Sequence, residues 1–162
     1  MRQVAIALIL INFLALATGS AHVLAQTPAG IRPGDGVGPV RLGMSPAEVQ
    51  AALGGPPSER YSNGWWLWAN QKIDVYFYQG RALMIDTESP ELATAEGIRI
   101  GSTDVDLIKA YGAPVCSGLN QYRGQAYLAW IYDGAVVFLN GSPRATFMVR
   151  VLPAGSGKAI CN

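Results

Sequence analysis

The chain has 162 residues, of which half are hydrophobic and only 14% are charged, with 12 basic against 11 acidic side chains. This length suits one compact domain. The near-neutral charge without a basic stripe argues against a nucleic-acid partner, because phosphate binding depends on clustered positive charge.

Residues 1–25 are predicted to be an export signal. Arg2 gives a positive start, the apolar run from Val4 to Ala17 follows, and Val23-Leu24-Ala25 fits a cleavage site. Cleavage after Ala21 is the alternative. An uncleaved anchor would need about 20 apolar residues, which is more than this run supplies. We therefore expect a periplasmic or secreted protein of the bacterial envelope, without a stable membrane anchor after cleavage.

Removal of this signal would also take away the lone histidine, His22. Without histidine the chain has no Ser-His-Asp or Cys-His arrangement and no imidazole metal ligand. The remaining carboxylates are expected to cap helices, to lie in a linker or, like Asp74 and Asp86, to be solvated strand residues. We therefore expect no catalytic activity, no metal and no cofactor.

One stretch of the sequence occurs twice, at 40–56 and again at 98–114, and the two copies align without a gap. The identical pairs are Arg41/Arg99, Gly43/Gly101, Ala52/Ala110, Gly54/Gly112 and Pro56/Pro114. Self-similarity of this kind indicates a duplicated structural unit.

Each copy has the residues of a short capped helix. In the first copy Ser45 is a favourable N-cap, Glu48 completes a capping box, and Gly54 ends the helix. The matching residues of the second copy are Thr103, Asp106 and Gly112. Helices of roughly two turns are not stable alone in water, so each must pack its apolar side on another element.

Three runs of strand-forming residues follow each helix, separated by turn residues. They are Trp65–Ala69, Ile73–Tyr78 and Ala82–Asp86 in the first half, and Ala126–Tyr132, Ala135–Leu139 and Ala145–Leu152 in the second. The two halves share the order helix, strand, strand, strand, so we predict an α+β fold of two tandem αβββ repeats. The predicted segments are the signal 1–25, an extended lead-in 26–38, the first repeat 39–86, a linker 87–97, the second repeat 98–152 and a tail 153–162 with a flexible connector at 155–158.

These motifs resemble the β-lactamase inhibitory protein fold, in which two αβ repeats share one curved antiparallel sheet with the helices on one face. Its single-repeat relatives include small outer-membrane assembly lipoproteins of the SmpA/OmlA (BamE) type. The resemblance covers Gly38 to about Leu152 and implies an exported, non-catalytic protein that binds other proteins on the concave sheet face. The chain departs from the family inhibitor in having only two cysteines, and from the lipoproteins in lacking a lipidated cysteine.

The two cysteines, Cys116 and Cys161, most simply pair with each other in an oxidising compartment. We predict a structural disulfide that ties the C-terminal tail back to the second half.

The aromatic residues form the candidate binding surface. Strand alternation along 73–78 separates a core face, with Ile73, Val75 and Phe77, from an uncovered face. Candidate partner-binding residues on the uncovered face are Trp66, Trp68, Asp74, Tyr76, Tyr78, Trp130 and Tyr132. The pairs Trp65/Leu67 and Trp66/Trp68 cannot both point inward, and the sequence does not decide between them. An exposed aromatic patch is typical of an interaction site, whereas the alternative is that these rings belong to the core.

Together these patterns predict an exported protein-binding module whose partner is another extracytoplasmic protein, including the case of an inhibitor. An envelope assembly factor and a small-ligand or carbohydrate binder are the alternatives.

Overall fold

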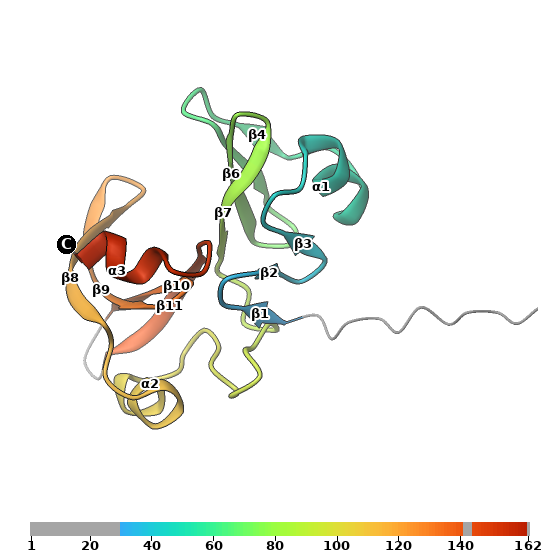
Figure 1. Cartoon of the computed structure of the whole chain (residues 1–162). Coiled ribbons are helices and arrows are strands. Elements are labelled where there is room, and N and C mark those ends of the chain that lie inside the picture. The colour runs from blue at the N-terminus through green and yellow to red at the C-terminus, as the bar shows by residue number, and fades with distance from the viewer. Residues whose placement is uncertain (1–29, 141–143, 162) are drawn as a thin grey trace, which may run out of the picture.

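The structure is a computed structural model that describes residues 30–140 and 144–161. It is an α+β protein of short helices and mostly antiparallel strands (Figure 1). The predicted export signal at 1–25 and the start of the lead-in lie outside the described residues.

The first elements form a small antiparallel sheet in the order β1 (Ile31–Arg32), β2 (Gly36–Val37), β3 (Val40–Arg41). The segment expected to be an extended lead-in therefore supplies two of its strands. The Gly34 N–H donates to the Gly134 carbonyl at 3.0 Å, and a Cβ on Gly134 would lie 2.4 Å from the Gly34 nitrogen. Glycine at position 134 is thus what allows the small sheet to dock on the second half.

The main sheet has eight strands in the order β4-β5-β6-β7-β11-β10-β9-β8, and neighbouring strands pair antiparallel. The first half supplies β4 (Glu59–Arg60), β5 (Trp65–Trp68), β6 (Ile73–Tyr78) and β7 (Arg81–Thr87). The second half supplies β8 (Cys116–Tyr122), β9 (Gln125–Tyr132), β10 (Ala135–Asn140) and β11 (Ala145–Val151). Six of these strands were predicted from the sequence, whereas β4 and β8 were not.

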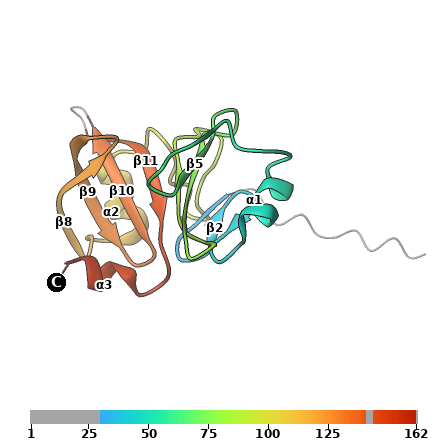
Figure 2. The same ribbon diagram turned by 90° about the horizontal axis from the view of Figure 1, so that it is seen from above.

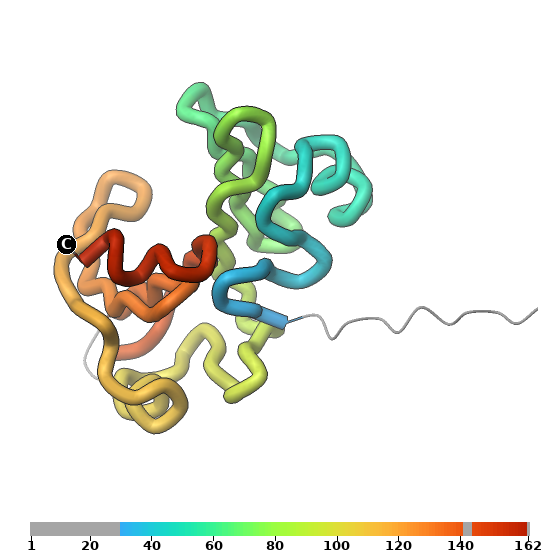
Figure 3. The backbone as a smooth tube through the Cα atoms, in the orientation of Figure 1, coloured from blue at the N-terminus to red at the C-terminus, as the bar shows by residue number. Residues whose placement is uncertain are grey.

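The two halves of the main sheet meet at β7 and β11. Pairing there is confined to residues 85–87 and 149–151, which form three residue pairs. Figures 1 and 2 show that the strands of the two halves differ strongly in direction on either side of this junction. The linker passes beside β1 on its way to the second half (Figure 3), and the Ile31 N–H donates to the Ala93 carbonyl at 2.9 Å.

The two predicted helices are confirmed as α1 (Pro46–Ala52) and α2 (Asp104–Tyr111), each with a complete capping box. The Ser45 N–H donates to the Glu48 carboxylate at 2.7 Å, and the Thr103 N–H donates to that of Asp106 at 2.8 Å. The expected flexible connector at 155–158 is wrong, because these residues enter a third helix, α3 (Ser156–Cys161). The predicted disulfide between Cys116 and Cys161 is present and attaches α3 to the start of β8.

The core lies mainly on the face of the main sheet that packs against α1, α2 and the small sheet, which we call the helix face. In the first half, Val49 and Leu53 of α1 pack in a cluster with Ile73, Val75 and Ile85 of the sheet. In the second half, Leu107 of α2 packs in a cluster with the sheet residues Trp130, Tyr132, Val137 and Leu139. A third cluster, built around Phe138 and Met148, fills the opposite side of the second half together with Leu152 and Cys161.

Candidate functional site

A row of charged side chains crosses the main sheet where the two halves meet. Strand pairing places Asp74 of β6 opposite Asp86 of β7, and Asp86 opposite Arg150 of β11. Their chain neighbours Val75, Ile85 and Val151 pack on the helix face, so by strand alternation the charged row lies on the other side, which we call the cleft face. Two carboxylates directly opposite each other repel, so this row requires cations nearby.

Asp86 and Arg150 form a bidentate ion pair across the junction of the two halves. The Arg150 Nε and Nη2 groups donate to the two carboxylate oxygens of Asp86, each at 2.8 Å. Asp86 is 1% exposed, and this burial raises its pKa to about 6 although Arg150 acts in the opposite direction. The Arg150 guanidinium also lies 5.2 Å from the ring centroid of Trp65, which gives it an aromatic contact on the cleft face.

Asp74 is held from the other half of the molecule. Arg123 Nη2 donates to its Oδ2 at 3.2 Å, and burial raises the pKa of Asp74. The second oxygen, Oδ1, is buried and has no hydrogen-bond partner among the described residues. An unpaired buried acceptor costs free energy, so the position of Asp74 in this network reduces the stability of the fold.

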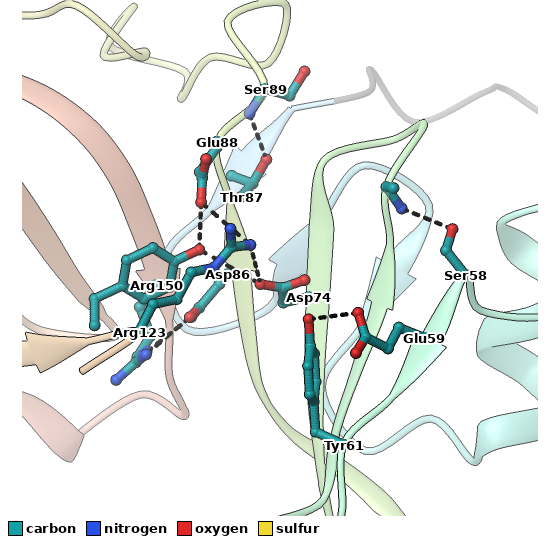
Figure 4. A network of polar contacts seen from close by, with 12 residues as sticks. Ser58, Glu59, Tyr61, Asp74, Asp86, Thr87, Glu88, Ser89, Arg123 and Arg150 are labelled. Atoms are coloured by element: carbon teal, nitrogen blue, oxygen red, sulfur yellow. Dashed lines mark hydrogen bonds and ion pairs between the residues drawn. The ribbon is translucent and has the colours of Figure 1, made fainter. Parts of the chain in front are cut away.

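Tyr122 and Glu88 complete the network, which Figure 4 shows in close view. The Tyr122 hydroxyl donates to the Glu88 carboxylate, and Arg123 lies 3.6 Å from that carboxylate. Burial raises the pKa of Tyr122, so its hydroxyl stays protonated and acts as a donor. Two arginines and one tyrosine from the second half therefore contact three carboxylates from the first.

The tip of the β8–β9 hairpin places Arg123 in this network. Arg123 and Gly124 have φ values of 48° and 78°, so both turn residues adopt left-handed backbone. Two such residues form the tight turn whose twist matches that of paired strands. The turn carries the Arg123 side chain across from the second half to β6.

A cavity of about 610 Å³ opens beside this network on the cleft face, and we call it the inter-half cleft. Its lining includes Tyr61, Trp65, Met84, Tyr122, Arg123 and Arg150. The cleft thus offers aromatic walls, arginine donors and carboxylate acceptors. No serine, threonine, cysteine or histidine is present among the described residues that line it.

Some predicted site residues do reach the cleft face. Asp74 lines the inter-half cleft, and Tyr76 lies on the same face, with its ring centroid 5.4 Å from that of Trp65. Tyr78 is 55% exposed at the end of β6. The expectation that Asp74 and Asp86 are solvated is wrong, because both are buried in the polar network.

The placement of the other predicted aromatic residues on the uncovered face is wrong. Trp68 is 2% exposed, and its indole N–H donates to the Gly55 carbonyl after α1. Trp66 packs beside it on the helix face. Trp130 and Tyr132 lie in the cluster with α2. These rings form the core because the helices cover this face of the sheet.

Several residues of the cleft were not among the predicted site residues. They are Tyr61, Trp65, Met84, Tyr122, Arg123 and Arg150. Strand alternation assigns Trp65 to the cleft face once Trp66 and Trp68 are known to lie on the helix face. The Arg123-Gly124 dipeptide is a turn signal, whereas nothing near Arg150 in the sequence points to a partner as distant as Asp86.

Comparison with known proteins gives no assignment. No family model matches the chain, and no curated protein matches it significantly. One similar solved structure is an extracellular protein containing a SCP domain from Bacillus anthracis str. Ames, with 12% identity and a TM-score of 0.46. The likeness covers 69% of this chain and 44% of that protein, and it is too low to indicate a shared function.

Two features are absent from the described residues. No helix among them is long and apolar enough to cross a membrane. No group of three or more histidine, cysteine, aspartate or glutamate side chains in this part of the chain could hold a metal ion.

Proposed function

We propose that this protein is an exported, non-catalytic module that binds another extracytoplasmic protein in the inter-half cleft. The observation that carries the proposal is the concentration of Tyr61, Trp65, Arg123 and Arg150 around this open cavity. Tryptophan, tyrosine and arginine dominate the energetics of protein interfaces, most of all where they line a pocket.

The chemistry of the cleft favours binding over catalysis. Each of its two carboxylates is engaged by an arginine, and both oxygens of Asp86 accept hydrogen bonds from Arg150, so Asp86 is not free to act as a general base. Serine, threonine, cysteine and histidine are missing from the described lining of the cleft, so it has no nucleophile of these types.

Export is the second part of the proposal. The predicted signal at 1–25 supports it, and so does the disulfide between Cys116 and Cys161, since such bonds persist in oxidising compartments.

Duplication of the helix-and-strand unit is the third part of the proposal. The matching capping boxes of α1 and α2, and the mirrored strand order on either side of β7 and β11, support a tandem repeat of the kind found in the β-lactamase inhibitory protein fold.

Two neighbouring tryptophans provide a matched test of the binding site. Trp65 lies on the cleft face and Trp66 on the helix face. The exported chain is immobilised, exposed to an envelope extract of its source organism, and the retained protein is identified by mass spectrometry. We expect Trp65→Ala to abolish capture of that protein with little change in melting temperature. Trp66→Ala should lower the melting temperature and retain capture.

Unchanged capture by Trp65→Ala would contradict the proposed binding site. Capture of outer-membrane components in place of a soluble protein would favour the envelope assembly role.

The size of the cleft favours a second candidate, a small-ligand or carbohydrate binder. A volume of about 610 Å³ lies within the range of about 300–1,000 Å³ typical of small-molecule sites. A thermal-shift screen with soluble glycans and small polar metabolites tests this candidate. A stabilising compound whose effect is lost in Trp65→Ala would support it over a protein partner.

A further inference from the structure

The main sheet ends in two very different edge strands. At one end, β4 has only two residues, Glu59 and Arg60, and both are charged and exposed. At the other end, β8 has seven residues, none of them charged and none a proline. Natural proteins protect edge strands by keeping them short or by placing charges and prolines on them, because an open edge pairs readily with another strand. β4 has this protection and β8 lacks it.

An apolar row of side chains runs across the second half and stops at β8. Strand pairing places Leu139 of β10 opposite Leu128 of β9, and Leu128 opposite Leu119 of β8. Leu139 is 3% exposed, Leu128 is half-buried, and Leu119 is 80% exposed. The row therefore extends from the α2 cluster of the core to the edge of the sheet, where Leu119 is exposed to solvent.

We propose that β8 pairs antiparallel with β8 of a second copy of this chain, about a two-fold axis at Leu119. Leu119 is the central residue of the strand, so this register uses all seven residues and places Leu119 beside the partner's Leu119. The apolar row then continues without interruption into the row of the second copy. Because the strand is uncharged, two copies meet without the repulsion that like charges directly opposite each other would cause.

Self-pairing also agrees with the surroundings of the strand. Gly118 has no heavy atom within 4 Å of the position of an added Cβ, so the face of the sheet to which this residue points is uncovered at the middle of β8. In the proposed register, Ser117 lies opposite the partner's Gln121 on the same face as Leu119. Both of these side chains are polar and exposed in the single chain. The interface therefore has an apolar centre flanked by polar pairs.

Measurement of molar mass in solution tests the proposal directly. We expect light scattering on the exported chain to give twice the mass of one chain at high concentration. Leu119→Lys places two ammonium groups opposite each other and should halve that mass. Val105→Lys is the matched control, since Val105 is 69% exposed on α2 and lies outside the interface. A wild-type protein that stays monomeric, or equal dissociation of both variants, would overturn the proposal.

A charge exchange tests the register. One variant carries Ser117→Lys with Gln121→Lys, and the other carries Ser117→Glu with Gln121→Glu. Each should be monomeric alone because like charges would face each other, and a one-to-one mixture should recover the doubled mass. Near-ultraviolet circular dichroism checks that each variant is folded. A mixture of folded variants that remains monomeric would refute this register, and binding of a foreign peptide strand to a monomeric wild type would refute the second copy as the occupant.

Discussion

Asp86 is the residue in which burial and pairing oppose each other most clearly. Both of its carboxylate oxygens accept hydrogen bonds from Arg150, which favours the charged form. Burial favours the neutral form and has the larger effect, so the pKa is raised to about 6. Asp74 and Glu88, which lie nearby, raise it further.

This raised pKa makes stability depend on pH in a defined direction. In the unfolded chain an aspartate has a pKa near 4, so between about pH 4 and 6 the folded state binds more protons than the unfolded state. The contribution of Asp86 to the stability of the folded protein is fully present below this window and is lost as the pH rises through about 6. As the pH rises across this window, we expect the titration of Asp86 to lower the free energy of unfolding by on the order of 2–3 kcal/mol, as measured by urea unfolding.

Asp86→Asn should remove this slope, so the difference between wild type and variant isolates the residue. The capping carboxylates Glu48 and Asp106 act in the opposite direction in both proteins. Their pKa values are lowered by hydrogen bonds from the backbone of Ser45 and Thr103, so their contribution is lost as the pH falls. A wild-type-minus-variant curve that is flat from pH 4 to 7 would contradict the prediction.

At the scale of elements, α1 and α2 show how much local chemistry determines. Each begins at a hydroxyl residue, has its carboxylate three residues later, and is followed by a glycine with positive φ. All of these groups are close in sequence, so both helices were predictable without knowledge of the tertiary structure.

The two caps should contribute equally to stability. We expect Ser45→Ala and Thr103→Ala each to lower the free energy of unfolding by about 1 kcal/mol. Their effects should add in the double variant, because the two helices lie in different halves and share no partner. Chemical denaturation of the three variants measures this. A loss confined to one helix would contradict the equivalence of the two copies.

The strands were harder to predict, for reasons that particular residues show. β8 contains serine, glycine, asparagine and glutamine, which have low strand preference, and its pairing with β9 supports it. All four residues of β5 are apolar, so alternation could not assign the inward face. The burial of Asp86 depends on Arg150, which lies 64 residues further along the chain, and no local sequence pattern predicts a contact between residues so far apart. The cleft was therefore only partly predictable, through Asp74, which lines it, and through Tyr76, which lies beside Trp65 on the same face.

At the scale of the whole molecule, the two halves are held together by few elements. These are the short β7–β11 junction, the arginine–carboxylate network, and the small sheet that contacts both the linker and the turn at Gly134. The second half also depends on its tail, because α3 and the disulfide cover part of the cluster around Phe138.

Loss of the disulfide should therefore destabilise the folded protein strongly. The bond joins residues 45 positions apart, and the chain-entropy relation gives about 4 kcal/mol for a loop of this length. We expect the double variant Cys116→Ser and Cys161→Ser to lose stability of this order in denaturant unfolding. Wild type under reducing conditions should behave in the same way, and an unchanged unfolding midpoint would contradict the prediction.

The three residue pairs that join β7 to β11 also have a consequence for how such proteins diversify. Because the junction is only three residue pairs long, a small change in its twist would alter the angle between the two halves and therefore the width of the inter-half cleft. Substitutions at Ile85 or Val151, whose side chains lie on the helix face, would then change the width of the cleft without replacing Asp86 or Arg150, which line it.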